Sequence, residues 1–531
     1  MTAVPPISPT SPLAAEARAQ AYRRGLWTAD TLADALHRAA VTTPGRELVV
    51  GGDVRLDAAT LYRQAGTLAH ALRARMAAGS VVSFMLPNWH EAAVVYLGAT
   101  LAGMVVNPIL PSLRDHELTF ILTDVDSRMI FVPGVFRGHD YAAMLARVAT
   151  GCDDPPEIVV VRGTGHTPYP SLFENPPGAD ATPPAPPHLD PDAVRMVMYT
   201  SGTTGKPKGV LHTHNSLHAL IRQIGEHWRV DPGDRFLVPS PIAHIGGSIY
   251  AFECPLLLGS TAVLMERWDP DAAVAAMIGE RCTHMAGATP FLSGLLAAAE
   301  RTGTRLPHLK VFICGGASVP PSLIRTATTY FDHAVVSRVY GSTEVPVTTV
   351  GSTAPGDVDH AADTDGRPGI AEIRIVDGEI RARGAQMLQG YLDPLDSAAA
   401  FDADGYFRTG DLGTWVDGDY LVVTGRAKDI IIRNGENISP KEIEDILATA
   451  PGIAEIAVVG VPDPRTGERA CAVVVPEPGA APGLETMREA LAARGVAAFK
   501  FPERIELWDS LPKNDAGKVL KHQIRAALVE G

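Results

Sequence analysis

The hydrophobic and polar positions of the chain form two alternating kinds of segment. Stretches rich in Ala and Leu are typical of helices, and short runs of β-branched residues between them are typical of strands. The predicted helices span residues 31–40, 58–78, 91–103, 272–280 and 290–299, and the predicted strands span residues 81–85, 129–132, 157–161, 194–199, 236–239, 260–264 and 311–314. Strands separated by helices predict parallel sheets with helices on their faces. The fold class is therefore α/β.

The pattern changes twice towards the C-terminus. After about residue 365, short strands at 371–376, 379–383 and 420–424 are separated by Gly and Asp turns, which predicts a small β-rich unit. Beyond Gly425 we expect a strand at 429–433, a hairpin turn at Asn434-Gly435 and a capping box at 439–442 with proline at the first helical position. A compact C-terminal domain of about a hundred residues follows from this pattern. Nine prolines between residues 167 and 192 predict a surface loop, because the α/β alternation resumes beyond them.

Composition and charge exclude several classes of protein. The 531 residues are 46% hydrophobic and 20% charged, which is typical of a soluble globular protein of two or three domains. The net charge of −14 and the lack of a basic run argue against nucleic acid as a partner. Five scattered cysteines without a CxxC pair, and no signal peptide, favour reduced thiols in the cytoplasm. The longest uncharged apolar run, residues 92–106, is too short to span a bilayer and predicts a buried helix.

The most informative segment is residues 199–209, which read YTSGTTGKPKG. Its glycines allow sharp turns, its Ser and Thr hydroxyls donate hydrogen bonds, and its two lysines bring positive charge, all of which suit a polyphosphate. The segment does not fit the Walker A pattern, and the β-branched run after it predicts a strand–loop–strand arrangement. A flexible Gly/Ser/Thr linker is the alternative.

This segment resembles the signature loop of the adenylate-forming superfamily, which includes acyl-CoA synthetases, firefly luciferase and the adenylation domains of peptide synthetases. Other family motifs follow in the expected order, so the resemblance covers roughly residues 30–525. It implies a large N-terminal domain, residues 1–424, with two α/β lobes and a β-rich subdomain, and a small mobile α+β C-terminal domain, residues 425–531. It also implies that ATP contacts Thr200, Ser201, Gly202, Thr203, Thr204, Gly205 and Lys206.

Three further motifs resemble the nucleotide contacts of the family. The segment CGGA at 314–317 resembles the adenine-side backbone motif, and YGSTE at 340–344 resembles the motif whose Tyr stacks on adenine, whose Thr bonds a phosphate or carboxylate and whose Glu holds Mg²⁺. The segment at 406–413 resembles the ribose motif. The residues implied by these resemblances are Gly315, Gly316, Ala317, Tyr340, Gly341, Ser342, Thr343, Glu344, Asp411 and, as a second ribose and phosphate contact, Arg426. Taken singly, each motif is also compatible with an ordinary turn or helix cap.

Four residues outside these motifs complete the implied site. Lys518 falls where the family has the lysine that bridges the substrate carboxylate and the α-phosphate, although a solvated terminal lysine is the simpler interpretation. His244 falls at the gate beside the substrate carboxylate, although a lone His next to glycines is more often a packed core residue. Lys428 matches the hinge between the two domains. Gly435 follows it in the segment that faces the acceptor during the second half-reaction.

The resemblance implies ATP-dependent activation of a carboxylic acid to an acyl-adenylate, followed by transfer to CoA, with release of AMP and pyrophosphate. The expected ligands are ATP, Mg²⁺, CoA and a carboxylic acid, and a homodimer is a possible assembly. The alternative within the same fold is an enzyme that passes its adenylate to a carrier protein, an amine or another nucleophile. From a different class, a non-catalytic nucleotide-binding or scaffold protein would keep only the fold. Zinc protease, α/β-hydrolase and Rossmann motifs are absent from the sequence.

The sequence says less about the acid that is activated. The segment from His244 to Tyr250 has no acidic residue before Glu253, so an α-ammonium group would lack a partner and amino acids are disfavoured. The lining that the resemblance implies is small and weakly polar, which leaves room for a ring or a medium acyl chain: Gly246, Ser248, Gly287, Ser342 and Thr348. Pro346 should bend the chain beside this pocket.

Overall fold

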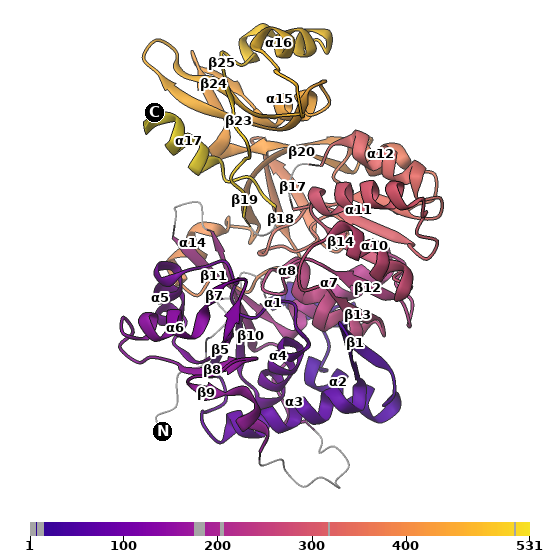
Figure 1. The fold of residues 1–531 in the computed structure, drawn as a ribbon, viewed down its shortest axis with the longest axis vertical. Coiled ribbons are helices and arrows are strands. Elements are labelled where there is room, and N and C mark those ends of the chain that lie inside the picture. Colours follow the sequence, from indigo (N-terminus) through magenta and orange to yellow (C-terminus); the bar gives the residue numbers. More distant parts are fainter. Residues whose placement is uncertain are drawn as a thin grey trace.

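Two seven-stranded sheets with helices on their faces form the body of the protein, as Figure 1 shows. The structure is a computed structural model, and it describes residues 7, 15–174, 186–201, 206–316, 319–514 and 517–530. The two sheets correspond to the two predicted α/β lobes. The predicted fold class is thereby confirmed.

The first sheet carries the glycine-rich segment at its edge. Its strand order is β11-β10-β4-β3-β5-β8-β9, and all neighbours are parallel except β10 and β11. The strands are β3 (Val81–Phe84), β4 (Val105–Pro108), β5 (Ser127–Pro133), β8 (Glu157–Val161), β9 (Thr167–Pro168), β10 (Val194–Ser201) and β11 (Pro207–Thr213). Strands β3 and β4 are completely buried, and their two polar side chains pair with each other, because the Ser83 hydroxyl donates to Asn107 Oδ1 at 3.0 Å.

The second sheet brings several other motifs to the ends of its strands. Its order is β16-β15-β14-β12-β13-β1-β2, and only β1 and β2 are antiparallel. The strands are β1 (Glu47–Gly51), β2 (Val54–Asp57), β12 (Arg235–Val238), β13 (Thr261–Leu264), β14 (His284–Gly287), β15 (Val311–Cys314) and β16 (Val335–Arg338). Because the carboxyl ends of parallel strands share one edge, the segments after β12, β14, β15 and β16 lie together.

Helices cover both sheets. They are α1 (Ala15–Arg23), α2 (Leu32–Thr42), α3 (Ala58–Arg73), α4 (His90–Ala102), α5 (Asp115–Asp124), α6 (Tyr141–Ala149), α7 (His214–His227), α8 (Ile245–Ser248), α9 (Cys254–Leu257), α10 (Pro270–Gly279), α11 (Thr289–Thr302) and α12 (Pro321–Tyr330). The longest apolar run of the sequence forms α4 and then β4, and α4 is buried along nearly its whole length, as predicted. Among the described residues, every helix is too short or too polar to cross a membrane.

The β-rich unit is an antiparallel sheet of four strands in sequence order. Its strands are β17 (Glu372–Val376), β18 (Glu379–Arg383), β19 (Phe407–Val416) and β20 (Tyr420–Arg426), and the helices α13 (Val358–Asp363) and α14 (Pro394–Ala400) accompany it. Strand β20 continues to Arg426, two residues past the predicted end of the large domain. The division at residues 424 and 425 stays a prediction.

A five-stranded mixed sheet with three helices forms the C-terminal part. Its strands are β21 (Ile431–Arg433), β22 (Glu436–Ile438), β23 (Ile453–Asp463), β24 (Gly467–Pro476) and β25 (Arg504–Leu507), and its helices are α15 (Pro440–Leu447), α16 (Leu484–Ala493) and α17 (Lys521–Glu530). The Asn434-Gly435 turn is confirmed: Arg433 pairs with Glu436, and φ is +52° at Asn434 and +83° at Gly435.

Two details of the sequence prediction are wrong. Residues Ala427–Asp429 form a 3₁₀ turn, so the predicted strand at 429–433 begins only at Ile431. Ser439 precedes α15 but does not form a capping box, because its hydroxyl donates to the Thr424 carbonyl at 2.5 Å. The predicted proline-rich loop begins with β9 and the 3₁₀ turn Tyr169–Phe173, and its residues 175–185 lie outside the described residues.

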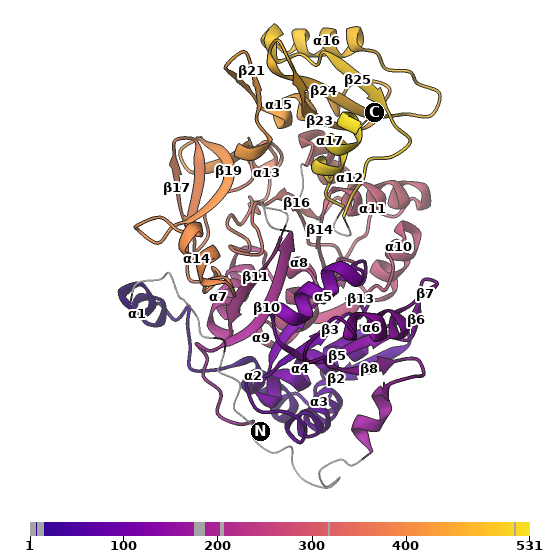
Figure 2. The same ribbon diagram turned by 90° about the vertical axis from the view of Figure 1, so that its left-hand side faces the viewer.

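The C-terminal part sits at one end of the body. Figures 1 and 2 both show it above β19 and β20, with α17 closest to the body. The segment before α17 reaches the second lobe, because a Cβ added at Gly517 would lie 3.3 Å from Pro290 at the start of α11. This segment before α17 therefore lies beside the start of α11, which follows the carboxyl end of β14 in the second sheet.

Candidate active site

The predicted phosphate loop joins two paired strands. Thr200 of β10 is in register with Lys208 of β11, which confirms the strand–loop–strand arrangement. Lys208 forms an ion pair with Asp396 at 2.7 Å, and the Lys206 ammonium lies 5.3 Å from the centre of the Phe120 ring. Of the other predicted loop residues, Ser201 ends β10, and Gly202, Thr203, Thr204 and Gly205 lie outside the described residues.

Glu344 is held by two donors from different elements. Its Oε1 accepts a hydrogen bond from the Tyr391 hydroxyl at 3.0 Å and one from the Thr200 hydroxyl at 3.5 Å. Burial and the neighbouring Glu344 charge raise the pKa of Tyr391, so this phenol stays a donor. Tyr391 was not predicted, and it is 47 residues from Glu344 in the sequence. The carboxylate is thereby fixed beside the start of the loop.

The backbone motif after β15 is closely packed. The Gly315 amide donates to the Gly287 carbonyl at 3.1 Å, and a Cβ at Gly315 would lie 2.8 Å from the Val339 carbonyl oxygen. Only glycine fits at such a distance. Gly316 follows, and Ala317 lies outside the described residues.

The segment after β16 is anchored by a buried histidine. The His212 Nε2 bonds the Thr343 carbonyl at 2.8 Å, and its Nδ1 bonds the Ser216 hydroxyl at 3.1 Å. Burial lowers the pKa of His212 to about 4, so the ring is neutral and can donate through one nitrogen only. The Ser342 hydroxyl accepts from the Val345 amide at 3.2 Å, which closes the turn that contains Thr343 and Glu344. A Cβ at Gly341 would lie 2.6 Å from the Val347 amide nitrogen.

Tyr340, Asp411 and Arg426, which we call the ribose cluster, lie in direct contact. The Tyr340 hydroxyl donates to Asp411 Oδ2 at 2.7 Å, and Arg426 Nε lies 2.9 Å from Asp411 Oδ1. Asp411 and Arg426 are register partners in β19 and β20, so strand pairing places their side chains together. Burial and the Asp411 charge raise the pKa of Tyr340 well above its ordinary value.

Lys518 lies near the ribose cluster, and His244 lies near Lys518. Burial lowers the pKa of Lys518 to about 8, the positive charges of Arg426 and Lys428 add to this effect, and the Asp411 carboxylate opposes it. Burial also lowers the pKa of His244, and the Lys518 charge lowers it further. His244 is therefore neutral, and its Nδ1 accepts a hydrogen bond from the Gly246 amide at 3.2 Å. His244 belongs to the entry to α8, and Lys518 belongs to the segment before α17 in the C-terminal part.

The hinge segment is tied to the C-terminal helix. Lys428 lies in the 3₁₀ turn Ala427–Asp429, and burial lowers its pKa. The neighbouring Asp429 pairs with Arg525 of α17 at 2.8 Å. Gly435 lies at the tip of the β21–β22 hairpin, and a Cβ added there would meet no atom within 4 Å. An added methyl group would thus meet open space at Gly435, whereas the neighbouring Asn434 amide donates to the Thr466 carbonyl at 2.8 Å.

The predicted acyl pocket differs from expectation in its polar groups. The Ser248 and Thr348 hydroxyls donate to the carbonyls of Ile245 and Val345, three residues earlier, so they are engaged with their own backbone. Gly246 is partly exposed beside the His244 ring. The helix after α8 is a π-helix, Ile249–Glu253, a form that is rare outside functional sites.

Glu253, the first acidic residue of the pocket segment, forms a buried ion pair. Its Oε1 accepts from Arg195 at 2.7 Å and from the Tyr96 hydroxyl at 2.6 Å, and the Arg195 and Glu253 side chains are each 2% exposed. Sequence reasoning missed Arg195, because it lies 58 residues from Glu253 with no local pattern to link them. The Glu253 carboxylate is therefore already paired with a buried cation, and its Oε1 is engaged by two donors.

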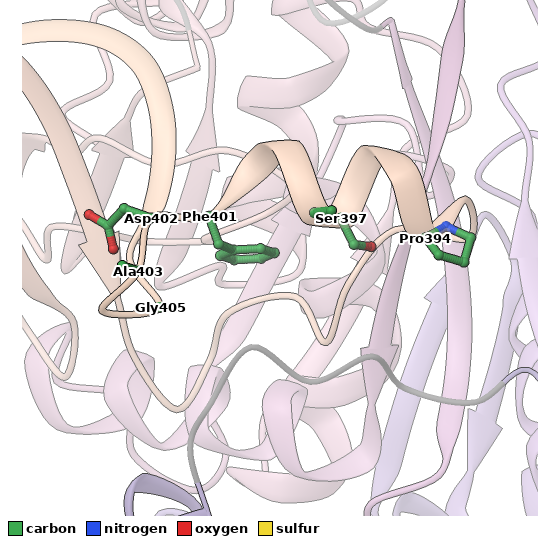
Figure 3. A pocket seen from close by; sticks show the side chains of 7 residues that line it. Pro394, Ser397, Phe401, Asp402, Ala403 and Gly405 are labelled. Atoms are coloured by element: carbon green, nitrogen blue, oxygen red, sulfur yellow. The ribbon is translucent and has the colours of Figure 1, made fainter.

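Two surface cavities lie away from these residues. One, of about 410 Å³, lies beside α14, where Figure 3 shows Phe401 and Asp402 at its rim. The other, of about 440 Å³, is lined by Arg55, Gly233, Arg235, Gly279, Glu280, Arg281, Thr283 and His308. None of the predicted site residues lines either cavity. Within the described ranges, no three His, Cys, Asp or Glu side chains are grouped to hold a metal ion by themselves.

Comparisons with known proteins agree with this geometry. Residues 36–392 match the family described as AMP-binding enzyme, and residues 442–518 match the AMP-binding enzyme C-terminal domain. A medium-chain fatty-acid–CoA ligase of Escherichia coli (strain K12) is 34% identical over 96% of this chain and 93% of its own length. The crystal structure of ATP-bound MatB from Rhodopseudomonas palustris is 29% identical with a TM-score of 0.81, covering 93% of this chain and 98% of its own. The amide bond synthetase McbA from Marinactinospora thermotolerans is 27% identical with a TM-score of 0.83, covering 94% and 99%.

Proposed function

The chain belongs to the family of AMP-binding enzymes, and from this premise we propose that it is an acid–thiol ligase that forms acyl-CoA. The enzyme activates a carboxylic acid with ATP and then transfers the acyl group to CoA. In the first half-reaction a carboxylate oxygen attacks the α-phosphorus of ATP, and the bond to the β-phosphate breaks to release pyrophosphate. In the second, the CoA sulfur attacks the acyl carbon and AMP leaves, while the thiol proton passes to solvent.

The observation that carries this proposal is the position of Lys518. Its charge lowers the pKa of His244, and the charges of Arg426 and Asp411 act on Lys518 itself. An acid bound beside His244 and a nucleotide bound at the ribose cluster would meet at this lysine. Because the first half-reaction brings two anions together, a cation at that point stabilises the transition state.

The remaining predicted residues have roles that fit this arrangement. We assign the nucleotide sugar to the ribose cluster, the adenine side to Gly315, Gly316 and the Tyr340 ring, and the phosphates to the loop after Thr200. Glu344 fits a Mg²⁺ site, because a single oriented carboxylate combined with substrate phosphates is the usual way in which this ion is bound. When bound, the ion would neutralise charge on the triphosphate.

Domain rotation is the proposed link between the two half-reactions. In the present arrangement the charges of Arg426 and Asp411 act on Lys518, and there is open space beside Gly435, which fits the first half-reaction. Rotation at Lys428 would withdraw Lys518 and bring the hairpin to the acyl-adenylate. The second lobe and the ribose cluster would keep their positions.

We propose that the substrate is a carboxylic acid whose only charged group is its carboxylate, and not an α-amino acid. Glu253 is engaged by Arg195 and Tyr96, so the acid in the pocket segment does not serve an ammonium group. The small side chains that line the predicted acyl pocket are compatible with aryl, alicyclic and medium-chain acids alike. A cytoplasmic location and a homodimer stay predictions from the sequence.

The test is ATP–pyrophosphate exchange with a panel of aryl, alicyclic and fatty acids, followed by AMP release with and without CoA. We expect exchange with at least one acid and CoA-dependent release of AMP. No exchange with any acid would contradict the proposal. Amine-dependent release in place of CoA-dependent release would favour the second candidate, an amide-forming enzyme, which the similarity to the amide bond synthetase supports.

A further inference from the structure

Asp365 lies outside every predicted motif and uses all of its polar atoms to join separate parts of the large domain. Its amide donates to the Leu421 carbonyl at 2.7 Å, and its carbonyl accepts from the Thr349 hydroxyl. Its two carboxylate oxygens accept from Arg338 Nη2 at 2.7 Å and from the Val423 amide at 2.8 Å. One residue therefore connects β16, the segment after it and β20.

These contacts lead to the ribose cluster from both sides. The Thr349 hydroxyl that donates to Asp365 also accepts from the Tyr340 amide at 2.8 Å, and the Thr349 amide donates to the Tyr340 carbonyl at 3.0 Å. On the other side, Val423 precedes Arg426 by three residues in the same strand. Tyr340 and Arg426 both contact Asp411, so the three members of the cluster depend on the relative position of β16 and β20.

The buried ion pair makes this connection rigid. Arg338 is 4% exposed and Asp365 is 9% exposed, and a second Arg338 nitrogen donates to the Ala362 carbonyl at 2.8 Å. A buried carboxylate cannot exchange its partners for water without a large cost, so its geometry is strongly restricted. The backbone is also close-packed here, since Gly366 lies against Gly351, where an added Cβ would lie 2.5 Å from the Gly351 nitrogen.

We propose that Asp365 is a positioning residue for nucleotide sugar recognition, acting through Thr349 on Tyr340 and through β20 on Arg426. Asp365 does not touch the nucleotide itself. The inference rests on the proposed function, because it takes the ribose cluster to be the place where the sugar hydroxyls bind. It assigns to a residue outside the motifs the role of fixing the second lobe and the β-rich unit relative to each other around that sugar.

The test measures binding, so that it can be read even if turnover fails. The Kd values of ATP and 2′-deoxy-ATP are measured by calorimetry for the full-length wild type and for Asp365→Asn. The side-chain NH₂ of the introduced Asn must face either Arg338 or the Val423 amide, so that two hydrogen-bond donors oppose each other. The side-chain volume is almost the same in Asp and Asn. We expect the wild type to prefer ATP by about tenfold to a hundredfold, the worth of a hydrogen bond to a charged group, and Asp365→Asn to lose most of that preference.

Two further variants keep the test decisive. Thr349→Val removes the relay hydroxyl with little change of shape and should reproduce the loss of preference, which covers the case in which Asp365→Asn fails to fold. Glu253→Gln weakens the other buried ion pair and should change the two Kd values by the same factor. An unchanged ATP preference in folded Asp365→Asn and Thr349→Val would overturn the inference, as would a wild type that does not distinguish the two nucleotides. Absence of pyrophosphate exchange with preserved sugar preference would contradict only the proposed function.

Discussion

Removal of the Lys518 charge should separate the two half-reactions. A unit charge about 4 Å from a phosphate oxygen is worth about 4 kcal/mol at an effective dielectric constant near 20, which corresponds to about a thousandfold in rate. Lys518→Ala should therefore slow adenylate formation by about three orders of magnitude. Thioester formation from supplied acyl-AMP and CoA should be nearly unchanged, because the proposed domain rotation withdraws Lys518 in that step.

The pH dependence gives an independent measure of the same charge. Lowering the pKa of an ammonium from 10.5 to about 8 costs its charged form about 3 kcal/mol, which phosphate binding can offset. The charged form predominates below the pKa, so kcat/KM for ATP in the exchange reaction should be constant below about pH 8 and fall about tenfold per pH unit above it. Lys518→Arg, which remains charged throughout, should lack this fall.

The assay is ATP–pyrophosphate exchange from pH 6.5 to 9.5 for the wild type, Lys518→Ala and Lys518→Arg, with thioester formation from acyl-AMP as the matched control. Equal losses in both half-reactions would refute the assigned role of Lys518. An alkaline fall that persists in Lys518→Ala would show that another group titrates, and Lys428, whose pKa burial also lowers, would be the first to examine.

Three other outcomes are expected. Lys428→Pro should slow thioester formation more than exchange, because proline restricts the backbone rotation of the hinge, and equal rates in both assays would argue against a hinge there. Gly435→Ala should impair only the thioester half-reaction, since φ of +83° costs alanine about 1 kcal/mol while leaving space for its methyl group, and a defect in exchange would contradict this. Arg195→Met should lower the free energy of unfolding, measured in urea, by about 3–5 kcal/mol, because it leaves the buried Glu253 carboxylate unpaired. The double variant Arg195→Met/Glu253→Met should recover much of this lost stability. A single variant as stable as the wild type would show that the pair is not buried in solution.

Local patterns predicted the elements and the motif positions well. The two-residue turn at Asn434-Gly435 and the strand pair around the phosphate loop follow from short segments whose backbone preferences are strong. The placement of Asp411 beside Arg426 follows from their positions in two neighbouring strands. In these cases the residues that determine the geometry lie close together in the sequence.

The partners of the site residues could not be predicted in the same way. Tyr391 meets Glu344 across 47 residues, and Arg338 meets Asp365 across 27, with no periodic pattern connecting either pair. Ser439 has the sequence signature of a helix cap but donates to Thr424, because the tertiary fold offers it a carbonyl that the isolated segment lacks. Which polar side chains become partners is determined by how the sheets and helices pack against each other, which no local sequence pattern reports.

The continuation of β20 to Arg426 has a practical meaning for chimeric enzymes. A crossover between residues 424 and 425 would divide a single strand, and the incoming half would bring its own arginine to face an unrelated aspartate. A crossover after Arg426 leaves β20 and its partner β19 as one inherited unit. Exchange of C-terminal domains between relatives should therefore preserve nucleotide affinity when the junction is placed in the 3₁₀ turn, and reduce it when the junction is placed two residues earlier.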